Sequence, residues 1–327
     1  MSTSKRLTEV FESAPEIPFD DSSRFILFSD CHRGDNSWSD DLAHNQTLLW
    51  YALKRYHEDG FTYIEVGDGD ELWENKKFED IRKAHSHLFW QMRQFHQENR
   101  LYLIWGNHNA DWKEPKNVER HLYGFHNERT DENEPLFDGI TVHEGLVLRH
   151  SDTGHRILVV HGHQGDLWSD RLWRFSRFWV RYIWKPLQMV GIKDPTSPAK
   201  NFKKQREVEQ RIIAWIEEND NQMLICGHTH RPMFPEQGNP LYFNIGSCVH
   251  PRCITGIEIQ DRKIELVKWW VRPDDKSGVL CVTKETKAGP KRLRDFLPLR
   301  SRFSWKSALT PAMNASWDIC RAAVAAA

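Results

Sequence analysis

Five short polar motifs, each placed directly after an apolar run, constrain the fold of this 327-residue chain more than any other feature. In chain order the motifs are Ser29-Asp30-Cys31-His32, Gly67-Asp68-Gly69-Asp70-Glu71, Gly106-Asn107-His108-Asn109, Val160-His161-Gly162-His163 and Gly227-His228-Thr229-His230. The runs before them, at residues 25–28, 63–66, 101–105, 157–160 and 223–226, are typical of buried strands. Because open α/β folds place their sites at the carboxyl ends of strands, we expect these side chains to converge on one edge of a sheet.

The segments between the motifs predict an α/β chain in which two sheets form a sandwich flanked by helices. Helices are predicted at residues 40–58, 80–98 and 202–218, and further strands at 242–245, 254–259 and 264–271. Residues 113–137 are polar, which predicts an irregular surface excursion, and the basic tail 284–306 is expected to have little regular structure.

The domain organisation follows from where this pattern begins, breaks and stops. We expect a partly ordered lead-in at 1–22, a main domain at 23–275 with a helical insertion at 164–218, and a basic C-terminal extension at 276–327. Within the insertion, five basic residues recur every three or four positions beside an aromatic face, a spacing typical of an amphipathic helix. The basic residues are Arg171, Arg174, Arg177, Arg181 and Lys185, and the face includes Leu172, Phe175 and Trp179.

This helix admits two interpretations. It is either a packed or dimer-forming helix whose arginines are its solvated face, or a cap over the site. As a cap, its aromatic side chains would contact acyl chains and its arginines phosphate or anionic lipid headgroups, which makes Arg174 and Trp179 candidate substrate contacts.

Charge and cysteine content bear on the partners of the protein and on its location in the cell. The 45 Lys and Arg nearly balance the 46 Asp and Glu, so no overall basic field favours nucleic-acid binding. The six cysteines contain no C-x-x-C pair and the N-terminus lacks an apolar signal segment, which favours a cytoplasmic location. No run reaches the roughly 18 apolar residues of a spanning helix, although contact with the inner face of the membrane stays open. The oligomeric state is open as well.

The residue types in the motifs indicate a site for two metal ions. One ligand set comprises Asp30, His32, Asp68 and His230, and the other comprises Asp68, Asn107, His161 and His228. Asp68 belongs to both because a carboxylate can bridge ions roughly 3.5–4 Å apart. In an extended segment residues i and i+2 share a face, so Asp30 and His32 can reach one ion. Mixed imidazole, carboxylate and amide ligands suit Mn²⁺, Fe or Zn²⁺, and we take Mn²⁺ as the first candidate.

The order D-x-H, G-D-x-x-E, G-N-H, H-x-H and G-H-T-H, over residues 24–271, resembles the calcineurin-like metallophosphoesterase superfamily. The resemblance implies a four-layer αββα sandwich, the metal shell just described, and attack on phosphorus by a water that the ions activate. It also implies a catalytic role for His108, as a hydrogen-bond donor to phosphate or as the acid that protonates the leaving oxygen. Asp68 is chosen over Asp70 because only Asp68 fits G-D-x-x-E with Glu71. Asn109 stands where the family usually has an acidic residue, and Asp111 is a candidate replacement.

Within this superfamily, Gly-His-Thr-His-Arg231-Pro232 and the insertion after the fourth motif most resemble the UDP-2,3-diacylglucosamine diphosphatase branch. That resemblance implies a lipid-linked sugar nucleotide as substrate, with His163 and Arg231 as further candidate contacts. The branch commonly carries Arg where this chain has His108, and Asp where it has His163. A phosphodiesterase or phosphomonoesterase acting on a small or nucleotide substrate therefore stays open, as does a non-catalytic binding module.

Overall fold

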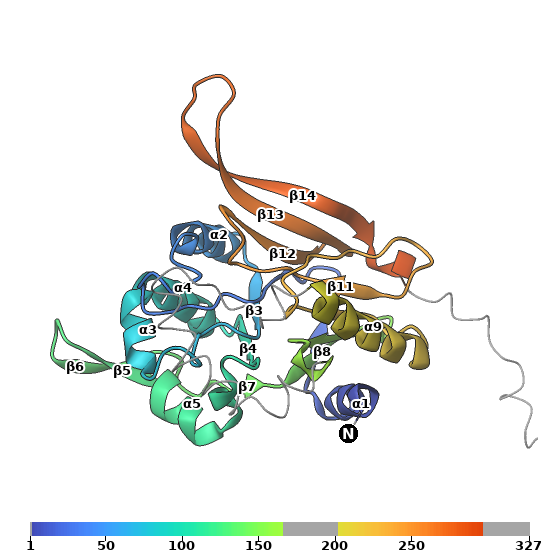
Figure 1. The fold of residues 1–327 in the computed structure, drawn as a ribbon, viewed down its shortest axis with the longest axis horizontal. Coiled ribbons are helices and arrows are strands. Elements are labelled where there is room, and N and C mark those ends of the chain that lie inside the picture. Colours follow the sequence, from blue (N-terminus) through green and yellow to red (C-terminus); the bar gives the residue numbers. More distant parts are fainter. Residues whose placement is uncertain (1, 166–201, 297–327) are drawn as a thin grey trace, which may run out of the picture. The chain divides into compact units, whose positions relative to one another are not determined.

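The computed structural model describes residues 2–165 and 202–296 (Figure 1). Contacts divide the chain into two compact units, Met1–Asp295 and Phe296–Ala327, and the fold and the site lie in the first. No helix in the described ranges is both long and apolar enough to cross a lipid bilayer.

A seven-stranded sheet carries the first three motifs. Its order is β14 (Leu280–Arg292), β13 (Lys263–Pro273), β12 (Cys253–Gln260), β2 (Phe25–Phe28), β3 (Thr62–Val66), β4 (Leu101–Ile104) and β7 (Val142–His143). The strands from β2 to β7 are parallel, whereas β12, β13 and β14 pair antiparallel. The carboxyl ends of β2, β3 and β4 therefore open at the same edge.

A five-stranded sheet carries the last two motifs. Its order is β1 (Glu16–Phe19), β8 (Gly145–His150), β9 (Arg156–Val160), β10 (Leu224–Cys226) and β11 (Tyr242–Asn244). The strands β9, β10 and β11 are parallel, and β8 pairs antiparallel with β9. A separate hairpin joins β5 (Gly124–Asn127) to β6 (Glu132–Pro135).

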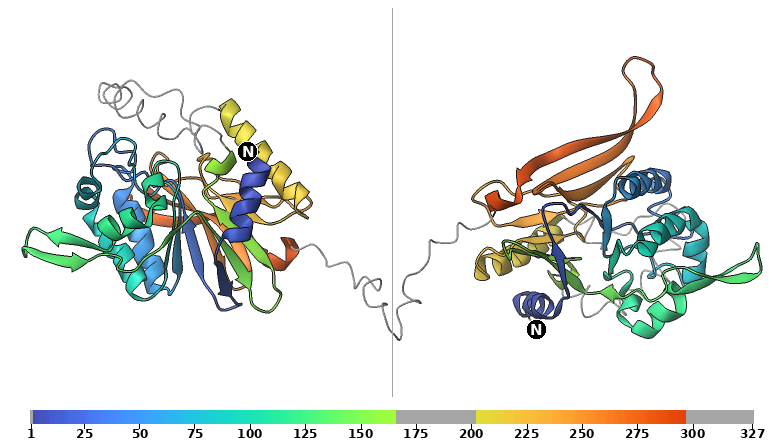
Figure 2. Two further views of the ribbon diagram at one scale, coloured as in Figure 1. Left: turned by 90° about the horizontal axis from the view of Figure 1, so that it is seen from below. Right: turned by 180° about the vertical axis from the view of Figure 1, so that it is seen from behind.

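Helices cover the outer face of each sheet, and Figure 2 shows the resulting helix–sheet–sheet–helix order. On the seven-stranded sheet lie α2 (Gln46–Glu58), α3 (Phe78–Ala84), α4 (Ser86–Gln97) and α5 (Pro115–Leu122), whose buried apolar side chains form one core with those of the strands. On the five-stranded sheet lie α1 (Thr3–Ser13) and α9 (Phe202–Glu218), with a second core beneath them. The predicted αββα arrangement is confirmed.

The predicted helix at 40–58 begins only at Gln46. The Asp40 side chain accepts hydrogen bonds from the backbone N–H groups of Asn36 and Leu42, which hold the preceding residues in turns. The predicted helix at 80–98 is interrupted at His85, whose backbone leaves helical geometry (φ −111°, ψ 29°). The buried His85 ring contacts Asp40 at 2.7 Å, and this tertiary contact accounts for the break.

Three segments contain more regular structure than the sequence predicted. Residues 113–137 contain α5 and the β5–β6 hairpin, and the tail is a strand as far as Arg292, because β14 extends the sheet beside β13. The lead-in contains α1 and β1, where Leu7 and Val10 are buried at helical spacing.

The helix α9 contributes to the layer that covers the five-stranded sheet, rather than standing apart as an insertion. Its buried residues Ile212 and Trp215 pack in the core with α1, and the Trp215 indole donates a hydrogen bond of 3.0 Å to Thr8. The rest of the predicted insertion, residues 166–201, lies outside the described residues.

Candidate metal centre

The five motifs form loops at the carboxyl ends of β2, β3, β4, β9 and β10, and backbone hydrogen bonds join them to one another. The N–H of His32 donates to the carbonyl of Asp68 at 2.8 Å, which ties the first loop to the second. The N–H of Gly227 donates to the carbonyl of His161 at 2.9 Å, which ties the fifth loop to the fourth. The predicted convergence of strand ends thus places all five motifs side by side.

The backbone of these loops is not extended, contrary to the expectation for Asp30 and His32. Five candidate ligands have left-handed backbone conformations: Asp30 (φ 53°), His32 (φ 47°), Asp68 (φ 49°), His228 (φ 67°) and His230 (φ 55°). Such conformations cost on the order of 1–3 kcal/mol each in non-glycine residues and cluster at functional sites. In the first motif, two left-handed residues at alternate positions turn the chain sharply after β2, and the side chains of Asp30 and His32 still approach each other to 3.8 Å.

The first predicted ligand set is assembled around the ring of His32. Its Nε2 lies 3.3 Å from Nε2 of His230 and 3.8 Å from Oδ1 of Asp30. Oδ1 of Asp30 is in turn 3.1 Å from Nε2 of His230. Oδ2 of Asp68 approaches His32 Nε2 to 3.9 Å, which completes the set.

The second predicted set is assembled around the same Asp68 oxygen. Oδ2 of Asp68 lies 3.1 Å from Nε2 of His161, and one ligand atom from each of Asp68, His161 and His228 falls within 4.8 Å of the others. His161 donates from Nδ1 to the backbone carbonyl of Val66 at 3.0 Å, which leaves Nε2 as its metal-binding nitrogen. The buried Oδ1 of Asn107 accepts no hydrogen bond from the described residues, as expected for an amide oxygen that a cation would satisfy.

Glycine at two positions allows the loops to approach this closely. A Cβ at Gly106 would overlap the Asp68 carboxylate, and one at Gly227 would overlap Ser29 and Asp30. The carboxylates are therefore held directly against the neighbouring backbone.

Buried charges shift the pKa values of the candidate ligands strongly. Burial alone would raise the pKa of the Asp68 carboxyl, but the charges of His161 and His108 outweigh it and hold that pKa well below its usual range. Burial alone would lower the pKa of His32, but its hydrogen bond to Glu71 and the nearby carboxylates raise it to about 10. The site thus favours positive charge between its carboxylates. The donor set, the orphaned Asn107 oxygen and these shifts fit divalent metal ions.

Glu71 is a further site residue, which the sequence motif G-D-x-x-E contains but does not identify as a partner of histidine. Its Oε2 lies 2.6 Å from Nδ1 of His108 and 2.9 Å from Nδ1 of His32. The indole of Trp73 stacks on the His108 ring, with centroids 4.1 Å apart and planes at 19°. Glu71 therefore supplies an acidic partner to His108, the role considered for Asp111. The G-D-x-x-E spacing was the available signal.

The remaining predicted contacts are spread more widely. His163 is 1% exposed and packs against Trp105, and burial lowers its pKa well below 6.5. This placement favours packing behind His161 over contact with a substrate. Arg231 is 40% exposed and lies 3.4 Å from Glu209, so its guanidinium remains accessible beside His230. Arg174 and Trp179 lie outside the described residues.

The model of the family described as calcineurin-like phosphoesterase matches residues 23–232, which include all five motifs. The chain belongs to this family. It is accordingly a hydrolase that acts on phosphate esters, and the family uses divalent metals. No curated protein matches the sequence.

Solved structures similar to this calcineurin-like phosphoesterase share little sequence with it. Vps29 from Chaetomium thermophilum is 12% identical (TM-score 0.37), with 81% of this chain and 96% of that chain covered. A cold-active protein-tyrosine phosphatase from a Shewanella species is 14% identical (TM-score 0.38; 82% and 81% covered). A putative 5′-nucleotidase from Staphylococcus aureus is 16% identical (TM-score 0.33; 80% and 53% covered). Likenesses at this level leave the family model as the basis of the assignment.

Proposed function

We propose that this calcineurin-like phosphoesterase hydrolyses a phosphodiester or pyrophosphate bond with two divalent metal ions. The observation that carries the proposal is the position of Asp68 Oδ2, 3.1 Å from Nε2 of His161 and 3.9 Å from Nε2 of His32. The two histidines belong to different ligand sets, so this carboxylate lies where it can bridge two ions. The burial of Asp68 and the hydrogen bond that its other oxygen accepts from the N–H of His108, at 2.8 Å, fix the position of this carboxylate.

The seven metal ligands would be those of the two sets. Asp30, His32 and His230 would hold one ion, Asn107, His161 and His228 the other, and Asp68 both. This mixture of carboxylate, amide and imidazole donors suits Mn²⁺, Fe and Zn²⁺ alike, and we take Mn²⁺ as the first candidate. When bound, such ions activate water as a nucleophile and neutralise charge on the phosphate oxygens.

His108 is placed to handle a proton at the edge of this centre. Its Nδ1 contacts Glu71, so Nε2 is the nitrogen left to meet a substrate. The ring is 21% exposed and is held flat against Trp73, which fixes its orientation without closing it off. We assign to Nε2 either a hydrogen bond to a phosphate oxygen or protonation of the leaving oxygen.

The proposed substrate is a lipid-linked sugar nucleotide such as UDP-2,3-diacylglucosamine, met by a cytoplasmic enzyme at the inner face of the membrane. Support comes from the Gly-His-Thr-His-Arg-Pro sequence and from the exposed Arg231 beside the candidate ligand His230. Arg174 and Trp179 add a basic and aromatic sequence suited to phosphate and acyl chains.

Hydrolysis of two substrates by the Mn²⁺-supplemented protein tests the proposal. UDP-2,3-diacylglucosamine is compared with bis-p-nitrophenyl phosphate, and Asn107→Ala serves as the control that removes one ligand. Release of UMP from the lipid, lost in the control, is the expected result. Turnover of only the chromogenic diester would keep the phosphoesterase and discard the lipid substrate, whereas no metal-dependent turnover of either would overturn the proposal.

A further inference from the structure

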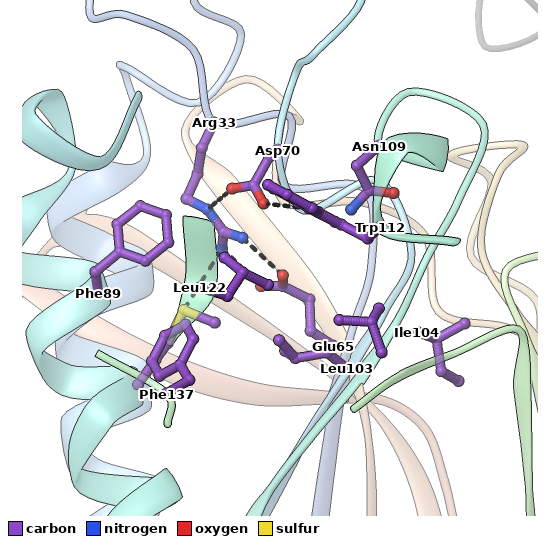
Figure 3. A pocket seen from close by; sticks show the side chains of 12 residues that line it. Arg33, Glu65, Asp70, Phe89, Leu103, Ile104, Asn109, Trp112, Leu122 and Phe137 are labelled. Atoms are coloured by element: carbon purple, nitrogen blue, oxygen red, sulfur yellow. Dashed lines mark hydrogen bonds and ion pairs between the residues drawn. The ribbon is translucent and has the colours of Figure 1, made fainter. Parts of the chain in front are cut away.

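A buried ion-pair network includes two residues, Arg33 and Asp70, that neighbour candidate metal ligands in the sequence. The guanidinium of Arg33, whose side chain is 1% exposed, donates to both carboxylate oxygens of Glu65 at 2.6 and 2.7 Å. Its Nε donates to Oδ1 of Asp70 at 2.9 Å. Figure 3 shows this arrangement, with Arg33 between the two carboxylates and the Phe89 ring beside it. None of these three charged side chains belongs to a proposed ligand set.

Each carboxylate has a further hydrogen-bond donor. The indole N–H of Trp112, in the short 3₁₀ helix Ala110–Lys113, donates to Oδ2 of Asp70 at 3.0 Å. The hydroxyl of Tyr63 donates to Oε2 of Glu65 at 2.8 Å. Both oxygens of both carboxylates are therefore satisfied in the interior, as buried charges require.

Three members of this network lie on or next to the loops that carry the candidate ligands, and Glu65 lies on β3. Arg33 directly follows His32, Asp70 lies two residues after Asp68, and Trp112 lies just beyond the Gly106–Asn109 motif. Backbone hydrogen bonds also join the first loop to the second. The N–H of Arg33 donates to the carbonyl of Gly69, and the N–H of Glu71 donates to the carbonyl of Arg33, both at 2.9 Å. Gly69 packs so closely against the Arg33–Glu65 pair that a Cβ there would overlap both side chains.

Stability alone does not account for a network of this kind. Replacing a buried ion pair by well-packed apolar residues is often neutral or stabilising, because the charges lose their hydration. Two carboxylates and one guanidinium also leave an unbalanced negative charge in the interior. What the network does supply is a fixed geometry, since the planar fork of arginine meets Glu65 with two parallel hydrogen bonds and Asp70 with a third.

We propose that Arg33, Asp70, Glu65 and Trp112 form a positioning network that sets the distances between the metal ligands of the first three loops. Asp70 is its central link, because it joins Arg33 of the first loop to Trp112 beyond the third. The inference rests on the proposed metal centre. Groups that hydrogen-bond directly to metal ligands affect metal affinity by roughly 10–100-fold. The network holds the ligand loops rather than the ligand side chains, so we expect an effect near the lower end of this range, about tenfold.

Two volume-conserving variants separate positioning from stability. Asp70→Asn weakens the link between loops, whereas the matched control Tyr63→Phe removes one hydrogen bond to Glu65 and leaves every loop linked. Calorimetry measures the affinity for Mn²⁺, and circular dichroism measures the melting temperature. Hydrolysis of bis-p-nitrophenyl phosphate gives kcat as a function of Mn²⁺ concentration. We expect both variants to have a lower melting temperature than the unaltered protein. Only Asp70→Asn is expected to bind Mn²⁺ more weakly, by about tenfold or more. Added Mn²⁺ should then restore part of the kcat that this variant loses.

Equal Mn²⁺ affinity in the two variants would overturn the positioning role. If the unaltered protein bound no Mn²⁺, the proposed metal centre would fail instead, so the two failures are distinguishable. If Asp70→Asn does not fold, Trp112→Phe takes its place, because it breaks the link between Asp70 and the third loop. Its Mn²⁺ affinity is then compared with that of Tyr63→Phe in the same way.

Discussion

The Glu71 carboxylate lies 2.6 Å from Nδ1 of His108, and the same oxygen lies 2.9 Å from Nδ1 of His32. One carboxylate thus orients both a proposed catalytic ring and a proposed metal ligand. With each Nδ1 engaged, each ring presents its Nε2 to the centre. Burial alone would raise the pKa of Glu71, but the charge of His108 and the hydrogen bonds from both rings lower it to about 2. Glu71 therefore stays ionised throughout the neutral range.

Glu71→Gln is expected to lower kcat and Mn²⁺ affinity together, each by about 10–100-fold. The amide of glutamine is neutral, so it cannot replace the charged oxygen that accepts hydrogen bonds from both rings. His32 and His108 then lose the partner that orients them both. Steady-state kinetics and calorimetry measure the two effects. The idea of a shared anchor would be wrong if kcat fell while Mn²⁺ affinity stayed at the level of the unaltered protein.

Asp68→Asn is expected to remove nearly all activity, on the order of 10³-fold or more, because both proposed ions would lose the charge of the bridging carboxylate. Asparagine is the substitution of choice since it tolerates the left-handed backbone of this position (φ 49°) better than alanine. Metal content and turnover are measured, with Asp152→Asn, on an exposed turn, as the control. Turnover close to normal in Asp68→Asn would sink the assignment of the bridge.

Mn²⁺ binding is expected to release protons at neutral pH. The pKa of His32 is raised to about 10, so this ring is protonated at pH 7, whereas a metal binds only neutral imidazole. Apparent affinity should consequently rise with pH up to about 10. Calorimetry in buffers of different ionisation enthalpy counts the protons released, and a count of zero at pH 7 would contradict the assignment of His32 as a ligand.

Acid should weaken the fold through His155, which is remote from the metal loops. Burial lowers the pKa of this residue from 6.5 to about 4, so the unfolded chain binds a proton in that window and the folded chain does not. The free energy of unfolding therefore decreases as pH falls below about 6.5. The decrease is about 1 kcal/mol between pH 7 and pH 5, after allowance for the partial exposure of the His155 ring. Urea titrations should show this part of the pH slope missing in His155→Leu; identical slopes would contradict it.

The sequence was informative where the signal is local. The five motifs and the strands before them predicted the edge where Asp30, Asp68 and His230 meet, because strand periodicity and ligand type are read within a few residues. The double contact of Glu71 and the Arg33–Asp70 network were not foreseen. Both contacts depend on which loops meet in the folded chain. From the sequence alone, a charged residue next to a ligand is predicted to be exposed to solvent, because charged side chains are seldom buried.

Asp30 also accepts a hydrogen bond of 2.9 Å from the backbone N–H of His228, across 198 positions of the chain. The first ligands therefore leave the ribosome long before the last, by roughly 10–40 s at typical rates of synthesis. During this interval the nascent chain holds carboxylates and imidazoles but no complete cation site. On the proposed ligand sets, neither ion would have all its ligands before β10 docks, so an occupied centre would mark a chain whose two sheets have already come together.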